Sequence, residues 1–149
     1  MSSEPDKSFR IAVAGAGLIG KRHVQAVERC AAAGVSAIVD PDPAAQDFAG
    51  SIGCNWHASV AEMLGAGSAD GVIVATPNPM HVENGLECVR AGVPVLVEKP
   101  IADNAAAAAQ LVNEATDLNV PVLVGHHRRL NPLIRAARQK IDSGAIGDL

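Results

Sequence analysis

The chain has 149 residues, of which 48% are hydrophobic and 19% are charged, and it carries a formal net charge of −4. This length and composition belong to one globular domain and exclude a disordered chain. The acidic balance, the aromatic content of 2% and the lack of any apolar run near the roughly 18 residues of a membrane span argue against binding to nucleic acid and against a place in a membrane.

The first predicted elements are a leader, a strand and a helix joined by glycines. Residues 1–8 are polar and are expected to form a loose leader, so the domain is assigned to residues 9–149. Residues 9–14 are apolar, as in a buried strand, and the next six read G-x-G-x-x-G. A helical period of apolar residues follows from residue 18 to residue 32, and Gly34 is expected to end that helix. This order is the first half of a dinucleotide-binding unit.

Each residue of the glycine turn has a physical role in binding a pyrophosphate. Gly15 permits the tight turn, Gly17 lets the backbone approach the phosphates, and Gly20 lets the helix pack closely on the strand. Leu18 and Ile19 begin the helix, whose free N–H groups and positive dipole end attract phosphate. The plainer interpretation is a glycine-rich turn that binds no ligand.

A second apolar strand, at residues 35–39, ends in Asp40, twenty residues after Gly20. An acid at that distance accepts hydrogen bonds from the adenosine ribose hydroxyls. Residues 41–43 read Pro-Asp-Pro and offer no Arg or Lys to neutralise a 2′-phosphate. The cofactor expected is therefore NAD, with NADP disfavoured.

The remaining elements continue the alternation of helices and strands. Helices are expected at residues 41–48, 60–64, 79–91, 105–118 and 132–141, and strands at residues 54–56, 71–75, 94–97 and 121–124. The strands are apolar throughout, which favours a parallel sheet covered on both faces. The predicted fold class is α/β, a doubly wound parallel sheet (Rossmann), in which ligands bind at the carboxyl ends of the strands.

Polar residues follow the strand at residues 71–75. The Thr76 hydroxyl and the Asn78 amide can hydrogen-bond a ribose or a carboxamide, and Pro77 stiffens the segment between them. The alternative is a proline-rich turn in which Asn78 caps the next helix. His81 lies one turn into that helix, where a packing histidine and a ligand contact are both open.

Glu98, Lys99 and Pro100 follow the strand at residues 94–97. A lysine at the end of a buried strand can interact with a substrate hydroxyl or take part in moving its proton. The alternative is a solvated surface pair followed by a turn proline.

The densest cationic segment, residues 125–129, follows the last strand and reads Gly-His-His-Arg-Arg. Its side chains can face substrate or phosphate, or pair with local acids in an exposed loop. Adjacent histidines point in different directions, so no metal site is expected there.

The three cysteines, Cys30, Cys54 and Cys88, are isolated and odd in number. They show neither a disulfide framework nor a metal-ligand spacing. Reduced thiols of this kind favour a cytoplasmic protein.

Together these segments resemble the glucose-fructose oxidoreductase / inositol dehydrogenase family (Gfo/Idh/MocA), from Phe9 to the last residue. The motifs that carry the resemblance are Gly15–Gly20 with His23, Ala75-Thr76-Pro77-Asn78 with His81, Glu98-Lys99-Pro100, and Gly125-x-x-Arg128-Arg129-x-x-Pro132. The resemblance implies a nicotinamide-dependent dehydrogenase or reductase that acts on a sugar, a polyol or a related hydroxy compound. Lys99 is then the catalytic lysine beside the nicotinamide and the reacting hydroxyl.

Residue chemistry and resemblance together give one set of candidate cofactor-binding residues. They are Gly15, Gly17, Leu18, Ile19, Gly20, Asp40, Thr76, Pro77, Asn78, His81, Glu98, Lys99 and Arg128. His23 lies on the helix stripe that faces the sheet and is interpreted as a packing residue, and no metal ligand is expected.

Members of the family carry a second α/β domain, which holds most of the substrate pocket, a catalytic Asp/His pair and commonly the oligomer interface. This chain stops at residues 144–149, a segment that resembles the entry to that domain. The resemblance therefore implies the cofactor half of an oxidoreductase, with self-association mainly through the absent domain. Two other classes stay open: a stand-alone NAD-binding module with a regulatory or partner-dependent role, and a flavin protein, because flavin enzymes share the glycine turn.

Overall fold

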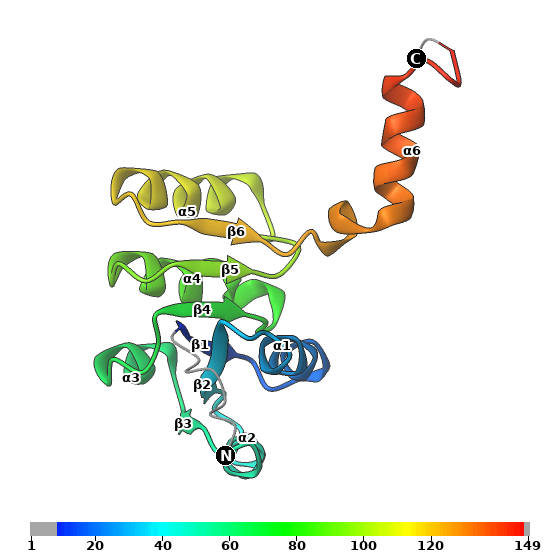
Figure 1. Cartoon of the computed structure of the whole chain (residues 1–149). Helices are drawn as coiled ribbons and strands as arrows, with labels where there is room; N and C mark the ends of the chain where they lie inside the picture. Colours follow the sequence, from blue (N-terminus) through cyan, green and yellow to red (C-terminus); the bar gives the residue numbers. More distant parts are fainter. Residues whose placement is uncertain (1–8, 148–149) are drawn as a thin grey trace.

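Within residues 9–147, which the computed structural model describes, six parallel strands form one sheet in the order β3-β2-β1-β4-β5-β6 (Figure 1). The predicted leader at residues 1–8 lies outside the described residues. The strands are β1 (Phe9–Ala14), β2 (Ala33–Val39), β3 (Asn55–His57), β4 (Gly71–Val74), β5 (Val95–Val97) and β6 (Val122–Val124). The helices are α1 (Leu18–Glu28), α2 (Ala44–Ser51), α3 (Val60–Gly65), α4 (His81–Arg90), α5 (Ala105–Asp117) and α6 (Pro132–Asp142), with 3-10 turns at η1 (Asn78–Met80) and η2 (His127–Leu130).

The strand β1 lies inside the sheet and pairs with β2 on one side and β4 on the other. The chain therefore moves outward from β1 to β3, crosses back to β4, and then moves outward again to β6. At such a reversal the carboxyl ends of neighbouring strands open into a crevice, where α/β proteins bind their ligands. The glycine turn after β1 and the polar segment after β4 meet at this point.

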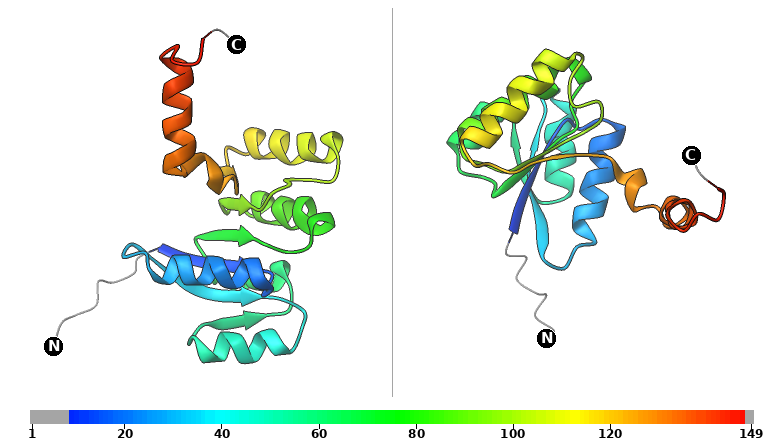
Figure 2. Two further views of the ribbon diagram at one scale, coloured as in Figure 1. Left: turned by 90° about the vertical axis from the view of Figure 1, so that its right-hand side faces the viewer. Right: turned by 90° about the horizontal axis from the view of Figure 1, so that it is seen from above.

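Helices cover the two faces of the sheet unevenly (Figure 2). On one face, α3, α4 and α5 contribute Met63, Leu86 and Leu111 to a buried cluster with residues of β1, β4 and β5. On the other face, α1 and α2 contribute Val24 and Ala45 to a second cluster. Helices on both sides of a parallel sheet make this a doubly wound α/β fold, as predicted.

Among the described residues, no helix covers β6 on the face that α1 and α2 share, and Leu96 of β5 is only partly buried there, so the expectation of complete cover on both faces is wrong at this end of the sheet. Leu96 of β5 and Leu123 of β6 line an open hollow on this face, and Leu123 is 64% exposed. The cause lies in the crossovers: α3, α4 and α5 all lie on the opposite face. The last helix, α6, does not return to the sheet.

The helix α6 starts where the sequence predicts, because the Asn131 side chain accepts a hydrogen bond from the N–H of Leu133 at 2.9 Å. The helix runs away from the sheet (Figures 1 and 2). All residues from 126 to 147 are exposed, and Leu133 is 78% exposed. Its apolar side chains therefore contribute nothing to the core of the described residues.

The end of α1 and the start of α2 differ from their predicted positions, each for a local reason. The helix α1 ends at Glu28 instead of residue 32, because Val27 is its last buried residue and the chain then turns into β2. Gly34 accordingly lies inside β2 and does not end a helix. The helix α2 begins at Ala44, whose N–H donates to the Asp42 carboxylate at 2.9 Å in a side-chain turn.

Candidate dinucleotide site

Gly15 and Gly20 fix the turn between β1 and α1, whereas Gly17 leaves open space beside it. Gly15 has φ +95°, and a Cβ there would lie 2.5 Å from the carbonyl oxygen of Ala75. A Cβ at Gly20 would collide with the carbonyl oxygen of Gly15. A Cβ at Gly17 would meet no protein atom within 4 Å. The first turn of α1 has no side-chain cap at Gly17, so its N–H groups are available to phosphate.

Asp40 stands at the end of β2, next to the glycine turn, and is held by backbone groups. One carboxylate oxygen accepts the N–H of Ala16 at 2.7 Å, and the other accepts the N–H of Asp42 at 2.9 Å. The indole of Trp56 donates to the Asp40 carbonyl oxygen at 3.0 Å. Each carboxylate oxygen keeps a further lone pair, so Asp40 can brace the turn and still accept from a ribose hydroxyl.

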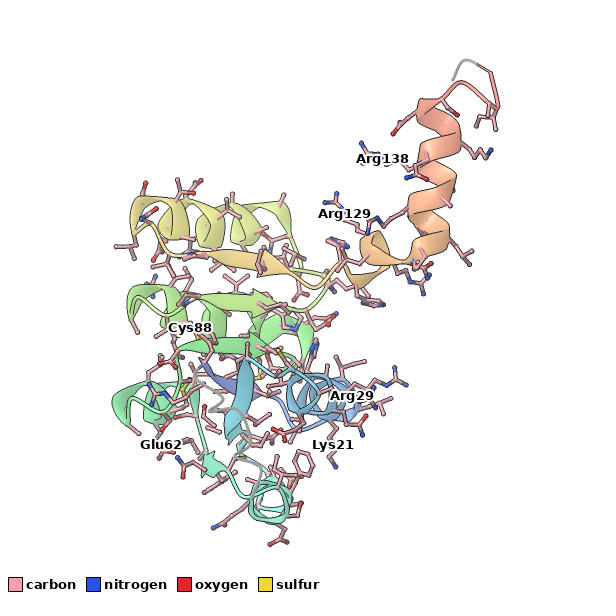
Figure 3. All side chains as sticks on the ribbon, viewed as in Figure 1. Lys21, Arg29, Glu62, Cys88, Arg129 and Arg138 are labelled. Carbon is pink, nitrogen blue, oxygen red and sulfur yellow. The ribbon has the colours of Figure 1, made fainter. Side chains whose placement is uncertain are left out.

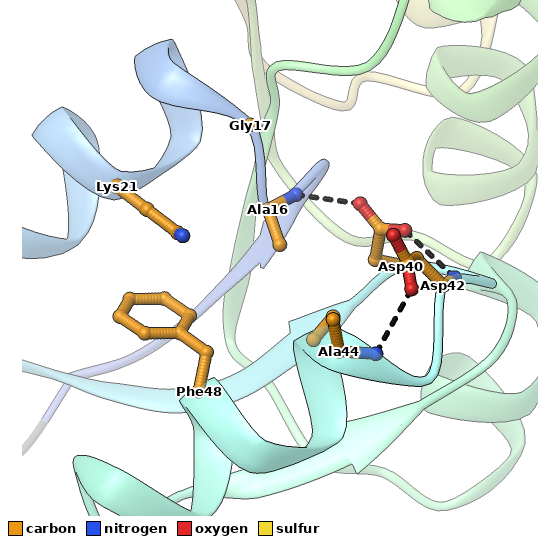
Figure 4. Close-up of a pocket in the computed structure, with 8 residues that line it drawn as sticks. Ala16, Gly17, Lys21, Asp40, Asp42, Ala44 and Phe48 are labelled. Carbon is orange, nitrogen blue, oxygen red and sulfur yellow. Dashed lines mark hydrogen bonds between the residues drawn. The ribbon is translucent and has the colours of Figure 1, made fainter.

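A cavity of about 230 Å³ lies between the glycine turn, the end of β2 and α2 (Figure 4). Its lining includes Gly17 and Asp40, as the sequence predicted, but also Lys21 and Phe48, which it did not. Lys21 directly follows Gly20, in the first turn of α1. This position next to the glycine turn is the sequence feature that could have identified it as a site residue. The Lys21 ammonium lies 5.0 Å from the centre of the Phe48 ring, a cation–π contact.

The segment after β4 is tied to the segment after β5 through His81. The two ring nitrogens of His81 lie 2.9 Å from the carbonyl oxygen of Thr76 and 2.7 Å from that of Pro100. A doubly protonated imidazole donates to both carbonyls, whereas the neutral ring donates to one. With 1% of its surface exposed, His81 holds the two loops together, which fits the packing interpretation. Its predicted contact with cofactor stays a prediction.

Thr76 and Asn78 have different local surroundings. The Thr76 hydroxyl accepts a hydrogen bond from the amide of Asn84 at 3.1 Å, which fixes its direction. Asn78 and Pro77 are exposed at the start of η1, and Asn78 lies within η1 and caps no helix. The backbone at the start of this segment, at Ala75 and Thr76, lies against Gly15, so the segment leaves β4 beside the glycine turn.

Glu98 is the most constrained polar side chain at the end of β5. One carboxylate oxygen lies 2.8 Å from Nε2 of His23 in α1, and the other accepts the N–H of Lys99 at 3.1 Å. A Cβ at Gly125 would lie 2.9 Å from this carboxylate, so a side chain there would have to displace the end of Glu98. The side chain of Lys99 itself is exposed. His23 is thus more than a packing residue, because it anchors the segment that carries Lys99.

Hydrogen bonds decide the ionisation of Glu98. Burial by itself would raise its pKa, but the hydrogen bonds from His23 and from the Lys99 N–H outweigh burial and lower the pKa below its ordinary value. The carboxylate is therefore charged at neutral pH, beside Lys99.

The cationic segment after β6 does not line the cavity beside Asp40, but it shares a groove with Ile19 of the glycine turn and with His23 and Glu98. His126, His127 and Arg129 line a groove of about 620 Å³ on the bare face of the sheet. Figure 3 shows Arg129 near the start of α6, with Arg138 farther along that helix, and Lys21 on α1. Arg128 lies in η2 and lines neither this groove nor the cavity beside Asp40. Its predicted contact with cofactor stays a prediction.

The described residues 9–147 show neither a metal-ligand cluster nor a membrane-spanning helix. No three His, Cys, Asp or Glu side chains there gather as metal ligands, and no helix there has the length and apolar character needed to cross a membrane. Burial raises the pKa of the Cys88 thiol to about 12, so this cysteine is an inert core residue.

The fold and this site define a class of protein. Residues 9–126 match the family described as "Oxidoreductase family, NAD-binding Rossmann fold". The chain therefore belongs to this NAD-binding oxidoreductase family, and the resemblance predicted from its motifs is confirmed.

Three relatives illustrate the range of the family. An inositol 2-dehydrogenase from Leifsonia xyli is 36% identical over 152 residues, which cover 100% of this chain and 44% of that protein. The crystal structure of scyllo-inositol dehydrogenase from Lactobacillus casei with NAD(H) and scyllo-inositol has a TM-score of 0.89 at 26% identity, covering 95% of this chain and 43% of that one. The WlbA dehydrogenase from Bordetella pertussis, in complex with NADH and UDP-GlcNAcA, has a TM-score of 0.88 at 28% identity, covering 93% of this chain and 41% of that one. The chain thus spans less than half the length of each of these relatives.

Proposed function

We propose that this chain supplies the NAD-binding part of a dehydrogenase that moves a hydride between nicotinamide and a sugar, a polyol or a related hydroxy compound. The observation that carries the proposal is the meeting of the glycine turn, Asp40 and the Lys99 segment along one edge of the sheet, at the point where the strand order reverses. The relatives are dehydrogenases of inositols and of a nucleotide sugar acid, which favours an oxidoreductase over a module without turnover.

The residues present fit a dinucleotide. The open space beside Gly17 accepts a pyrophosphate, and the uncapped N–H groups of α1 offer hydrogen bonds to it. The cavity between Asp40 and Phe48 accepts the adenosine end. Nicotinamide, when bound, supplies the hydride acceptor or donor.

Lys99 is the candidate catalytic residue on this chain. It leaves the sheet one strand beyond the segment of Thr76, and its backbone is held by Glu98. An ammonium group there hydrogen-bonds the substrate hydroxyl and stabilises the oxygen as its proton leaves. Thr76 and Asn78, on the neighbouring loop, offer polar groups to the ribose or the carboxamide.

Replacing Lys99 tests this assignment. NADH binding to wild type and to Lys99→Ala is measured by calorimetry, and turnover is measured by NADH absorbance with a panel of inositols, sugars and nucleotide sugars. We expect the variant to bind NADH within about threefold of wild type and to lose about 100-fold or more in kcat wherever wild type turns over. Lys140→Ala, on the distant helix α6, is the matched control. Equal losses in NADH affinity and in kcat would assign Lys99 to the cofactor pocket instead.

A further inference from the structure

Three charged side chains line the cavity that we assign to the adenosine end of the dinucleotide. They are Lys21 from α1, Asp40 from the end of β2, and Asp42 from the loop before α2. Figure 4 shows Lys21 with Phe48 on one side of the cavity and the two carboxylates on the other. Two negative charges and one positive charge leave the lining with a net charge of −1. The selectivity of this cavity therefore depends on more than Asp40.

Both carboxylates are held in place by the backbone. Asp40 accepts hydrogen bonds from the N–H groups of Ala16 and Asp42, and Asp42 accepts one from Ala44 at 2.9 Å. Turning either side chain away would leave those N–H groups without their acceptor, which costs free energy. Asp42 consequently keeps its charge at the cavity even when Asp40 is neutralised.

Lys21 is also directed into the cavity. Its ammonium lies 5.0 Å from the centre of the Phe48 ring, and Phe48 lines the same cavity from α2. A cation over an aromatic face remains available to an anion on its open side. A lysine is a compact charge that binds phosphate well, so this position suits a phosphate on the adenosine ribose.

We propose that Asp42 shares with Asp40 the exclusion of a 2′-phosphate, and that Lys21 is a cation placed to attract that phosphate but outweighed while both carboxylates are charged. The inference rests on the proposed function, because it takes this cavity as the adenosine end of the dinucleotide site. A 2′-phosphate carries about −1.5 to −2 charges near neutral pH, as other phosphate monoesters do. The two fixed carboxylates repel it, and the single ammonium does not offset both.

The test is a charge-removal series read by NADH and NADPH binding to this chain. The variants are Asp40→Asn, Asp42→Asn, the double Asn variant, and the double Asn variant with Lys21→Gln. Each Asn keeps one side-chain oxygen as an acceptor for the backbone, and thermal unfolding checks that each variant folds. Lys140→Gln in the double Asn variant is the matched control for loss of one lysine.

We expect Asp40→Asn alone to raise NADPH affinity by less than about threefold and the double Asn variant to raise it by about tenfold or more. Adding Lys21→Gln should remove that gain, while adding Lys140→Gln should preserve it. The inference is overturned if Asp40→Asn alone gives the whole gain, since Asp42 then has no part. It is also overturned if the gain survives Lys21→Gln.

A second measurement does not depend on the double variant folding. In otherwise wild-type protein, Lys21→Gln should weaken NADPH binding more than NADH binding, by about threefold or more. Equal weakening of both would place Lys21 on the shared pyrophosphate and overturn its role toward the 2′-phosphate. If wild type binds neither dinucleotide, the proposed function fails as well. If wild type binds NADH and NADPH equally well and still turns over substrate, the inference is overturned while the proposed function stands.

Discussion

The three glycines of the turn after β1 differ in what a side chain would meet. At Gly15 and Gly20 a Cβ would run into backbone atoms of the fold itself, whereas at Gly17 it would enter open space. Gly17 also has an extended backbone, with φ −70° and ψ −170°, that any residue can adopt. The fold therefore requires glycine at positions 15 and 20, whereas at Gly17 nothing in the described fold does, which fits the proposed phosphate contact.

This difference predicts opposite effects of substitution. Gly17→Val should keep the circular-dichroism spectrum and change the melting temperature little, yet lower NADH affinity by about 100-fold, because its side chain occupies the pyrophosphate space. Gly20→Ala should destabilise the protein by about 2 kcal/mol or more, because its Cβ meets a carbonyl oxygen. Normal NADH binding by Gly17→Val would show that the phosphates lie elsewhere.

The sequence predicts the individual glycines and Asp40 because each performs a local task that its spacing reveals. It does not reveal Lys21, Phe48 or the pairing of His23 with Glu98. These contacts join residues from different elements, and the last joins positions 75 apart in the chain. Lys21 meets Phe48 because α1 and α2 lie on the same face of the sheet, and His23 meets Glu98 because α1 lies near the end of β5, and no local pattern encodes either arrangement.

At the scale of elements, the pair of His23 and Glu98 fastens α1 to the end of β5. The two polar atoms lie 2.8 Å apart, and 14% of the Glu98 side chain is exposed. Hydrogen bonds from His23 and Lys99 lower the pKa of this carboxyl despite its burial. A carboxyl whose pKa is lower in the folded state stabilises the fold above its unfolded pKa, about 4.3, and loses that contribution as pH falls through the folded pKa.

Glu98→Gln should therefore cost stability near neutral pH and less in acid. We expect a loss of about 1 kcal/mol at pH 7, after allowance for partial exposure of the pair, and a shrinking difference from wild type as pH falls from about 5 to about 3. Urea unfolding midpoints across this range measure it. Asp117→Asn, on the exposed end of α5, is the control. A difference that stays constant with pH would remove the charge of Glu98 from the explanation.

The order of the elements could be predicted from the sequence, but the way the helices cover the sheet could not. Apolar runs separated by Gly and Pro predict the order of the strands and helices, because each run matches one periodicity. They do not predict that three successive crossover helices share a face and leave Leu96 and Leu123 uncovered. Cover depends on the path of the whole chain, and α6 has an amphipathic sequence whether or not it returns to the sheet.

At the scale of the whole molecule, the position of β1 ranks the parts of the fold by stability. This strand is paired on both sides, and Ala12, Val13 and Ala14 have no exposed surface. Its partner β4 is likewise paired on both sides. By contrast, β6 lies at an edge of the sheet, next to a bare face and to a helix with no buried residue.

Native-state hydrogen exchange should reveal this ranking as a gradient across the sheet. Amide protons of β1 and β4 are released only when the whole domain opens, whereas those of β6 and α6 exchange through local openings that leave the centre intact. We expect rates at least about 1000-fold slower in β1 than in α6, followed residue by residue by NMR. Uniform protection across the six strands would contradict it. Because the glycine turn leaves β1 and the cationic segment of residues 125–129 leaves β6, the proposed phosphate site rests on the part of the protein expected to open slowest, and the cationic segment rests on a part expected to open sooner.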